Sequence, residues 1–288
     1  MKQVVSICGV TLISALLLSA CQTNDPVASG TKSDTSSLTQ SSESDSSAMN
    51  VSSESDSSEK GTVAEESQSI EYTYQVNPAI FTIEPMNEAD NKKVALLTFD
   101  DAPDKHAVEI AKKLKSIDAP AVFFINGMYI ESDEGKEMLK EIYDMGFEIG
   151  NHSQTHANLS AISPEEQREE IVKTNELIYE TIGIKPRFFR APFGVNTDTS
   201  AEIIEQENMV FMNWTYGYDW EAEYQNPQAL TDVMLHTEYL NEGANLLMHD
   251  RSWTNEAVVG IAEGLREKGY TLIDPALILS PEREESTK

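Results

Sequence analysis

Short apolar runs alternate with amphipathic segments along the chain from residue 94 onward. The runs have the length and composition of buried strands, at 94–97, 121–125, 147–149, 187–190, 210–214, 245–248 and 270–273. The segments between them predict helices, over 107–117, 134–145, 164–181, 199–207, 226–243 and 255–268. Strands that alternate with helices form a mostly parallel sheet with helical crossovers. The pattern therefore predicts an α/β domain built as a distorted or incomplete (β/α) barrel with about seven parallel strands.

The helix predicted at 164–181 has clear signals at both ends. Ser163 is a good N-cap, Pro164 suits the first helical position, and Glu166 completes a capping box. Gly183 follows the last turn, where a residue with positive φ commonly ends a helix. We expect the helix to begin and end at these residues.

The N-terminus has the pattern of a targeting segment. Lys2 precedes an apolar stretch, 4–18, that is short for a membrane span. The stretch ends in Leu-Ser-Ala-Cys at 18–21, which resembles the bacterial lipobox. We therefore interpret 1–20 as a lipoprotein signal peptide and Cys21 as the lipidated residue, which would anchor the protein to the outer face of the cytoplasmic membrane. An ordinary signal peptide or an uncleaved anchor are the alternatives.

Residues 21–71 are rich in Ser, Asp and Glu. The heptapeptide Ser-Ser-Glu-Ser-Asp-Ser-Ser begins at Ser41 and again at Ser52, and no aromatic residue occurs before Tyr72. Such a segment cannot bury enough apolar surface to fold. We expect a disordered tether between the membrane and a catalytic domain at 72–288.

Charge and cysteine content exclude several classes of function. The formal net charge of −28 argues against a nucleic-acid partner, because phosphate binding needs clustered Lys and Arg. The two cysteines, Cys8 and Cys21, both lie in the targeting segment. The folded domain therefore has no disulfide framework and no cysteine-based zinc site.

Candidate chemistry follows two of the predicted strands. Asp100 and Asp101 come directly after 94–97, and adjacent residues of an extended chain point to opposite sides. One carboxylate could then reach a metal while the other accepts a proton. His152 and His156 are four residues apart, and on a helical turn they would share one face. Two imidazoles and one carboxylate form a three-ligand set that leaves room for water or substrate. A surface turn and two solvated histidines are the alternatives.

Five motifs occur in an order that identifies a family. The motifs are Thr98-Phe99-Asp100-Asp101, His152-Ser153-Gln154-Thr155-His156, Arg190-Ala191-Pro192-Phe193-Gly194, Asp219-Trp220 and Leu247-Met248-His249. Together they resemble the motifs of polysaccharide deacetylases of the NodB-homology type, carbohydrate esterase family 4, over about residues 90–280.

The resemblance implies a metal-dependent catalytic site. Asp100 matches the general base, and Arg190 matches the residue that pairs with it; a surface salt bridge is the alternative for Arg190. Asp101, His152 and His156 match the ligands of a divalent metal. Zinc is the first choice, with cobalt or manganese as alternatives. The metal would polarise the acetamide carbonyl and bind the attacking water.

The remaining motifs match the groups that handle the substrate. The backbone N–H of Ala191 matches an oxyanion donor. His249 matches the general acid, and Asp219 the carboxylate that pairs with it. Trp220 and Leu247 match an apolar pocket for the acetyl methyl group. Ordinary core packing is the alternative for both, and it is compatible with lining a pocket.

Three positions depart from the family pattern. Ala102 replaces the usual glycine after the carboxylate pair, and it would be strained if the turn needed positive φ. Tyr216 stands where an aspartate often supports the side of the site near Arg190. Phe193 replaces a frequent tyrosine and so lacks a hydroxyl.

The sequence therefore predicts hydrolytic de-N-acetylation of a cell-surface polysaccharide. Peptidoglycan N-acetylglucosamine is the preferred substrate, because a lipid anchor and a long tether place the domain near the wall. An O-acetyl esterase acting on another glycan and a wall-associated binding module with little catalysis are the alternatives. The sequence specifies no oligomeric state.

Overall fold

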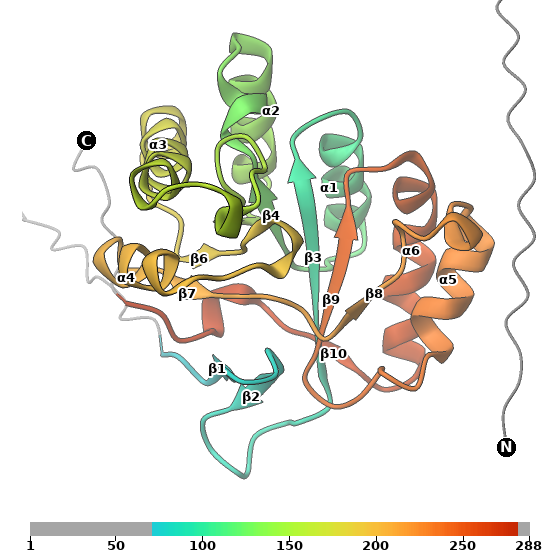
Figure 1. The fold of residues 1–288 in the computed structure, drawn as a ribbon. Coiled ribbons are helices and arrows are strands. Elements are labelled where there is room, and N and C mark those ends of the chain that lie inside the picture. The colour runs from blue at the N-terminus through green and yellow to red at the C-terminus, as the bar shows by residue number, and fades with distance from the viewer. Residues whose placement is uncertain (1–70, 282–288) are drawn as a thin grey trace, which may run out of the picture. The chain divides into compact units, whose positions relative to one another are not determined.

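Two sheets carry the strands of the domain (Figure 1). The structure, a computed structural model, describes residues 71–281, which all belong to one compact unit. A short antiparallel pair comprises β1 (Tyr74–Val76) and β2 (Ile83–Pro85). The main sheet comprises β3 (Val94–Ala102), β4 (Ala121–Ile125), β5 (Glu148–Asn151), β6 (Phe188–Phe189), β7 (Val210–Phe211), β8 (Tyr216–Gly217), β9 (Ala244–His249) and β10 (Thr271–Leu272).

The main sheet is parallel and open. Its strands follow the order β7-β6-β5-β4-β3-β9-β8, and β10 pairs with β3 outside this path. Ala95 of β3 pairs with Ala244 of β9 on one side and with Leu272 of β10 on the other. β10 therefore lies on the same edge of β3 as β4, which pairs with the later part of that strand. The predicted incomplete barrel of parallel strands is confirmed. The two-residue β8 was not predicted, because so short a strand has no periodicity of its own.

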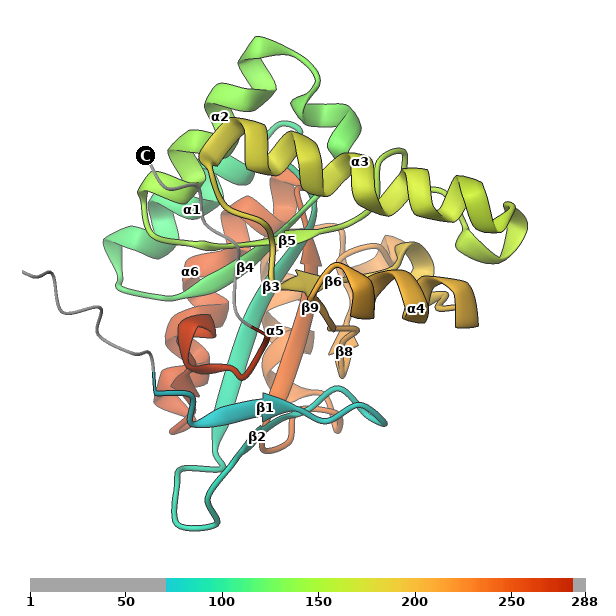
Figure 2. The same ribbon diagram turned by 90° about the vertical axis from the view of Figure 1, so that its left-hand side faces the viewer.

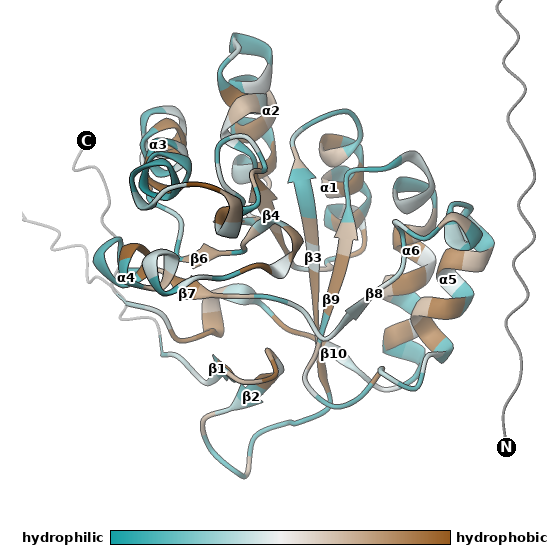
Figure 3. Cartoon of the chain, viewed as in Figure 1, coloured by the Kyte–Doolittle hydropathy of each residue, from teal (hydrophilic) through white to brown (hydrophobic). Residues whose placement is uncertain are grey.

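Strand β3 is buried on both faces, which explains its continuous apolar run. Ala95, Leu97 and Phe99 pack into the cluster that contains the apolar faces of helices from the outer layer. Val94 and Leu96 point the other way, into a cluster with residues of β1, β2 and β4. In Figure 3 the strand is apolar along its shaft and polar at its C-terminal tip. Polar side chains therefore gather at this end of the sheet.

The helices form a layer around the sheet (Figure 2). Contacts link them in the order α5, α6, α1, α2, α3 and α4. Their bounds are α1 (Ala107–Ser116), α2 (Asp133–Asp144), α3 (Pro164–Ile182), α4 (Asp198–Gln206), α5 (Pro227–His236) and α6 (Ser252–Glu267). Short 3-10 helices are η1 (Gly127–Ile130), η2 (Leu159–Ala161), η3 (Pro192–Gly194), η4 (Ala222–Tyr224) and η5 (Pro275–Leu277).

Helix α3 has the predicted ends. The Ser163 side chain accepts a hydrogen bond from the N–H of Glu166, and the Glu166 side chain accepts from the N–H of Ser163. Gly183 closes the helix in the left-handed region, with φ of 79°. The capping prediction is confirmed.

Helix α5 is shorter than predicted. It ends at His236 rather than near Gly243, because the backbone of Thr237 is extended. Gly243 instead lies against β2, where a Cβ atom would be 2.5 Å from the carbonyl oxygen of Ile83. Gly243, near which the helix was predicted to end, is therefore needed for a close approach between two chain segments.

The targeting segment and the tether lie outside the described residues, so the structure does not test Cys21 or the predictions for 1–70. Within 71–281, every helix is too short or too polar to cross a membrane.

Candidate active site

The carboxylate pair lies at the carboxyl end of β3, and its two members differ in backbone conformation. Asp100 continues the strand and is in register with His249 of β9. Asp101 has a φ of 59°, and the register with β4 shifts at this point. Asp100 Oδ2 lies 3.5 Å from Nε2 of His152 and Asp101 Oδ1 lies 3.9 Å from the same nitrogen. The prediction of opposite sides is wrong, because the bulge turns Asp101 back toward the site.

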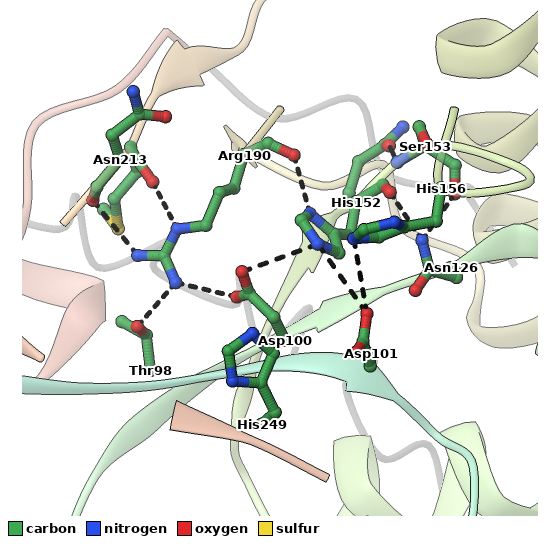
Figure 4. A network of polar contacts seen from close by, with 12 residues as sticks. Thr98, Asp100, Asp101, Asn126, His152, Ser153, His156, Arg190, Asn213 and His249 are labelled. Atoms are coloured by element: carbon green, nitrogen blue, oxygen red, sulfur yellow. Dashed lines mark hydrogen bonds and ion pairs between the residues drawn. The ribbon is translucent and has the colours of Figure 1, made fainter. Parts of the chain in front are cut away.

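Asp100 forms a buried ion pair with Arg190. The guanidinium Nη1 donates to Asp100 Oδ1 at 2.7 Å and to the Thr98 hydroxyl at 2.7 Å. The two charged residues are 2% and 0% exposed. The alternative of a surface salt bridge is therefore wrong. One oxygen of Asp100 faces Arg190 and the other faces the imidazole of His152 (Figure 4).

Further partners hold the guanidinium of Arg190 in place. Nε donates to the carbonyl of Met212 at 2.7 Å, and Nη2 donates to the carbonyl of Asn213 at 3.1 Å and to Asn245 Oδ1 at 3.4 Å. The guanidinium carbon lies 4.2 Å from the centroid of the Phe124 ring. A buried charge is tolerated only with such a complete set of partners. Arg190 is therefore a rigid support for Asp100.

Three side chains converge as a candidate metal site. One oxygen of Asp101 and one ring nitrogen each of His152 and His156 lie within 4.8 Å of one another. Nδ1 of His152 lies 2.8 Å from the carbonyl oxygen of Arg190, which can only accept a hydrogen bond. Nδ1 therefore carries the proton, and Nε2 presents its lone pair to the site. This donor set fits a catalytic zinc centre.

The surroundings of Asp101 and His152 favour the forms that bind metal. Burial opposes ionisation of Asp101, but the neighbouring imidazoles and Arg251 together lower the pKa of its carboxyl group. Burial lowers the pKa of His152, and the nearby carboxylates offset this only in part. A carboxylate and a neutral imidazole are the ligand forms.

The two histidines lie on a loop between β5 and η2, not on the predicted helical turn. Ser153 and His156 have φ of 65° and 59°, and these left-handed residues bring the ring centroids of His152 and His156 to 5.0 Å. Thr155 fastens the loop to α3, because its N–H and hydroxyl donate to the Glu170 carboxylate at 2.8 and 2.6 Å. A four-residue spacing does not distinguish such a loop from a helix.

His249 forms the second histidine–carboxylate unit of the site. Its Nδ1 lies 2.6 Å from Asp219 Oδ1, and its backbone N–H donates to Oδ2 at 2.6 Å. The hydroxyl of Thr254 also donates to Oδ2, at 2.7 Å. Burial lowers the pKa of His249, but the charge and hydrogen bond of the fully buried Asp219 outweigh this and raise the pKa above its ordinary value.

The predicted substrate contacts surround the same centre. Trp220 is 46% exposed and meets His249 edge-on, with ring centroids 5.6 Å apart. Leu247 lies buried on β9, two residues before His249. The N–H of Ala191 donates to no acceptor within residues 71–281. Gly217 permits this packing, since a Cβ atom there would lie 2.8 Å from the Trp220 ring.

Two of the departures from the family pattern lie beside the candidate metal ligands. The residue of this turn that has a positive φ is Asp101 and not Ala102. Ala102 therefore does not have the strain that a positive φ would cause. Phe193 is 63% exposed, and its ring lies edge-on to His156 at 4.7 Å.

The third departure, Tyr216, does not weaken the support of Arg190. Its hydroxyl donates to the carbonyl of Met234 on α5 at 2.8 Å. Arg190 obtains its partners from Thr98 and from the segment that contains Asn213.

Sequence reasoning missed two residues that directly follow His249. The Asp250 carboxylate is 2% exposed and accepts hydrogen bonds from the four backbone N–H groups of 104–107, at 2.6 to 3.0 Å. The Arg251 guanidinium donates to Asp101 Oδ2 at 2.8 Å. In the sequence, their position directly after a predicted catalytic residue was the signal that could have identified them.

Comparisons with known proteins agree with this geometry. Residues 87–212 match the family model described as polysaccharide deacetylase. A peptidoglycan-N-acetylglucosamine deacetylase from Bacillus cereus is 31% identical over 188 residues, which cover 62% of this chain and 68% of that one. The chain belongs to the polysaccharide deacetylase family.

Solved structures of this kind share the fold. A carbohydrate esterase family 4 pseudoenzyme from Bacillus anthracis is 34% identical, with a TM-score of 0.57 over 63% of each chain. The peptidoglycan deacetylase PdaC from Bacillus subtilis is 30% identical, with a TM-score of 0.57 over 65% of this chain and 89% of that chain. The predicted NodB-like architecture is therefore confirmed. The chain spans only 30, 46 and 48% of the length of three other curated relatives that it matches.

Proposed function

We propose that this protein is a metal-dependent hydrolase that removes N-acetyl groups from a bacterial cell-wall glycan. The observation that carries the proposal is the convergence of a supported carboxylate, a three-ligand metal set and a paired imidazole at the ends of β3, β5 and β9. Amide hydrolysis needs a base for water, an electrophile at the carbonyl and an acid for the leaving amine. The site contains residues suited to each task.

Asp101, His152 and His156 would hold the divalent ion, and zinc suits two nitrogens and one oxygen best. Cobalt or manganese are the alternatives. When bound, the ion supplies Lewis-acid polarisation of the acetamide carbonyl and lowers the pKa of water.

Asp100 is the proposed base. It accepts a proton from the water whose oxygen forms the new bond to the acetyl carbon. Its Oδ1 is held by Arg190, which leaves Oδ2 on the side of His152 to take the proton. Arg190 thus positions the base without contacting the substrate.

His249 is the proposed acid. It donates a proton to the sugar nitrogen as the carbon–nitrogen bond breaks, which yields acetate and a free amine. Because Asp219 contacts Nδ1, the Nε2 proton is the one available to the substrate. The raised pKa of His249 favours the protonated form that this role requires.

The remaining residues would bind the acetyl group. The N–H of Ala191 is available to donate to the oxyanion that develops from the carbonyl. Trp220 and Leu247 lie near His249 and offer an apolar surface to the methyl group.

N-Acetylglucosamine of peptidoglycan is the proposed substrate. This choice rests on the activity of the relative from Bacillus cereus, a peptidoglycan-N-acetylglucosamine deacetylase. The relative PdaC is described as a peptidoglycan-N-acetylmuramic acid deacetylase, which makes the neighbouring sugar the alternative. We also propose that Cys21 is lipidated and that 21–71 tether the domain, 72–288, outside the membrane.

The test is acetate release by the purified protein, with added zinc or cobalt, from peptidoglycan and separately from chitooligosaccharides. Mass spectrometry of the digested peptidoglycan shows which sugar loses its acetyl group. Asp100→Asn protein is the control for contaminating activity. Acetate from peptidoglycan supports the proposal, whereas a protein that binds metal and releases none from either polymer contradicts it.

A wall-binding module without turnover is the second candidate function. It is favoured by the similarity to the pseudoenzyme. A mutant of that pseudoenzyme has restored activity and a TM-score of 0.57 to this chain, so this fold occurs both with and without activity. Sedimentation with peptidoglycan in the absence of acetate release would support this function.

A further inference from the structure

Arg251 contacts the oxygen of Asp101 that faces away from the histidines. Its Nη2 lies 2.8 Å from Asp101 Oδ2, whereas Oδ1 of the same carboxylate lies 3.6 Å from Nε2 of His156. The two oxygens therefore have different partners, and Oδ1 is the one directed toward the other metal ligands.

The position of Arg251 is set by its buried neighbour Asp250. Asp250, the preceding residue, donates its N–H to the carbonyl of Asp100 and binds the start of α1 through its carboxylate. Nη1 of Arg251 donates to the carbonyl of Asp250 at 3.0 Å, so the guanidinium is held at two points. Its side chain is 37% exposed, and that of Asp101 is 15% exposed.

Each carboxylate of the site thus has its own arginine. Arg190 comes from the end of β6 and holds Asp100, and Arg251 comes from the end of β9 and holds Asp101. We propose that Arg251 is a positioning residue of the metal site, which keeps Asp101 a one-oxygen ligand and directs Oδ1 to the ion. The inference rests on the metal dependence proposed above.

Removal of Arg251 should change metal affinity in opposite directions, depending on whether the residue orients Asp101 or acts only through its charge. A guanidinium near a divalent cation repels it, so a residue acting through charge alone would weaken binding, and its removal would tighten binding. A residue that orients a ligand does the opposite, because a partner in the outer shell commonly improves metal affinity by about 10–100-fold.

The experiment compares Zn²⁺ dissociation constants of the full chain and of Arg251→Met and Arg251→Lys, by competition with a chromogenic chelator. Co²⁺ absorption spectra of the same proteins report the coordination of the ion. Lys112→Met is the matched control, because it also removes one cation from an exposed ion pair, with Glu141. Circular dichroism of the metal-free proteins verifies that each variant is folded.

We expect Arg251→Met to weaken Zn²⁺ binding by roughly ten-fold and to change the Co²⁺ spectrum, with partial rescue in Arg251→Lys. Lys112→Met should match the wild type. Tighter or unchanged binding by folded Arg251→Met, or misfolding of both Arg251 variants, would overturn the inference and leave the proposed function standing. Failure of the wild type to bind metal would overturn both.

Discussion

At the residue scale, neighbouring acidic groups acquire different roles from their surroundings. Asp100 is almost fully buried and its Oδ1 is paired with Arg190, whereas Asp101 faces the two histidines with one oxygen and Arg251 with the other. The same side chain therefore suits a base in one position and a ligand in the next. Predictions at this scale concern single substitutions that keep the shape of the side chain.

Asp100→Asn should abolish turnover but leave the metal bound. The amide cannot take a proton from water, and loss of a general base commonly costs about 10²–10⁴-fold in rate. The ligands Asp101, His152 and His156 are unchanged, so the affinity for Zn²⁺ should stay within about three-fold of the wild type. Acetate release and the chelator competition measure the two quantities, and retained activity would exclude Asp100 as the base.

Asp219→Asn should shift the pH dependence of kcat/KM. Asp219 raises the pKa of His249, so loss of its charge lowers that pKa. The acid is active when protonated, and activity falls as the pH rises through its pKa. The alkaline limb should therefore move to lower pH, together with a fall in the maximum rate. Asp232→Asn is the matched control, because it alters an exposed carboxylate 3.2 Å from His236.

At the element scale, the site depends on how strand ends and loops are fastened to helices. Asp250 joins the end of β9 to the start of α1 through four backbone N–H groups. Glu170 of α3 holds the loop of His152 and His156 through Thr155. Helices of the outer layer thus hold segments that carry or adjoin site residues.

Glu170→Ala should weaken metal binding by loosening the histidine loop. The change removes both hydrogen bonds to Thr155, whereas alanine keeps the helix propensity of α3. We expect a loss of roughly ten-fold in Zn²⁺ affinity, as for other outer partners of metal ligands. Glu169→Ala, one residue earlier, is the control. Equal affinities of the two variants would show that the loop holds its shape without Glu170.

At the scale of the whole molecule, the acidic composition and the N-terminal segment set the surroundings in which the domain works. A net charge of −28 disfavours direct attachment to anionic lipid, so membrane association needs a separate anchor. The lipobox-like sequence that ends at Cys21 supplies the proposed one. One acyl chain gives only marginal membrane binding, and stable anchoring takes a second chain or another signal.

Cys21→Ser should release the protein from the membrane. Serine has no thiol to receive the lipid, so the protein should move from the membrane fraction to the soluble fraction or the medium of bacteria that produce it. Immunoblotting of the fractions measures the change. Cys8→Ser is the matched control, because Cys8 lies within the predicted signal peptide. Membrane retention of Cys21→Ser would indicate an uncleaved anchor.

Local patterns predicted the sheet and the ends of α3, because apolar periodicity and capping act over a few residues. They failed at Gly243 and at the two-residue β8. The helix predicted over 226–243 ends at His236, and the role of Gly243 depends on contact with Ile83, which is distant in the sequence. The motifs brought together Asp100 and Arg190 correctly, but they carried no information on which further residues complete the site.

The sequence by itself determined the α/β alternation, the family and the residues that carry the candidate chemistry, since these depend on composition, order and short spacings. Only the tertiary structure decided where the side chains point. The bulge at Asp101, the left-handed loop of His152 and His156, and the pairing of Arg251 with Asp101 across 150 positions all depend on contacts with segments that are distant in the sequence. Such contacts have no local signal, so the geometry of the candidate metal site emerges only when the sheet brings the ends of β3, β5 and β9 together, with β4 between β5 and β3.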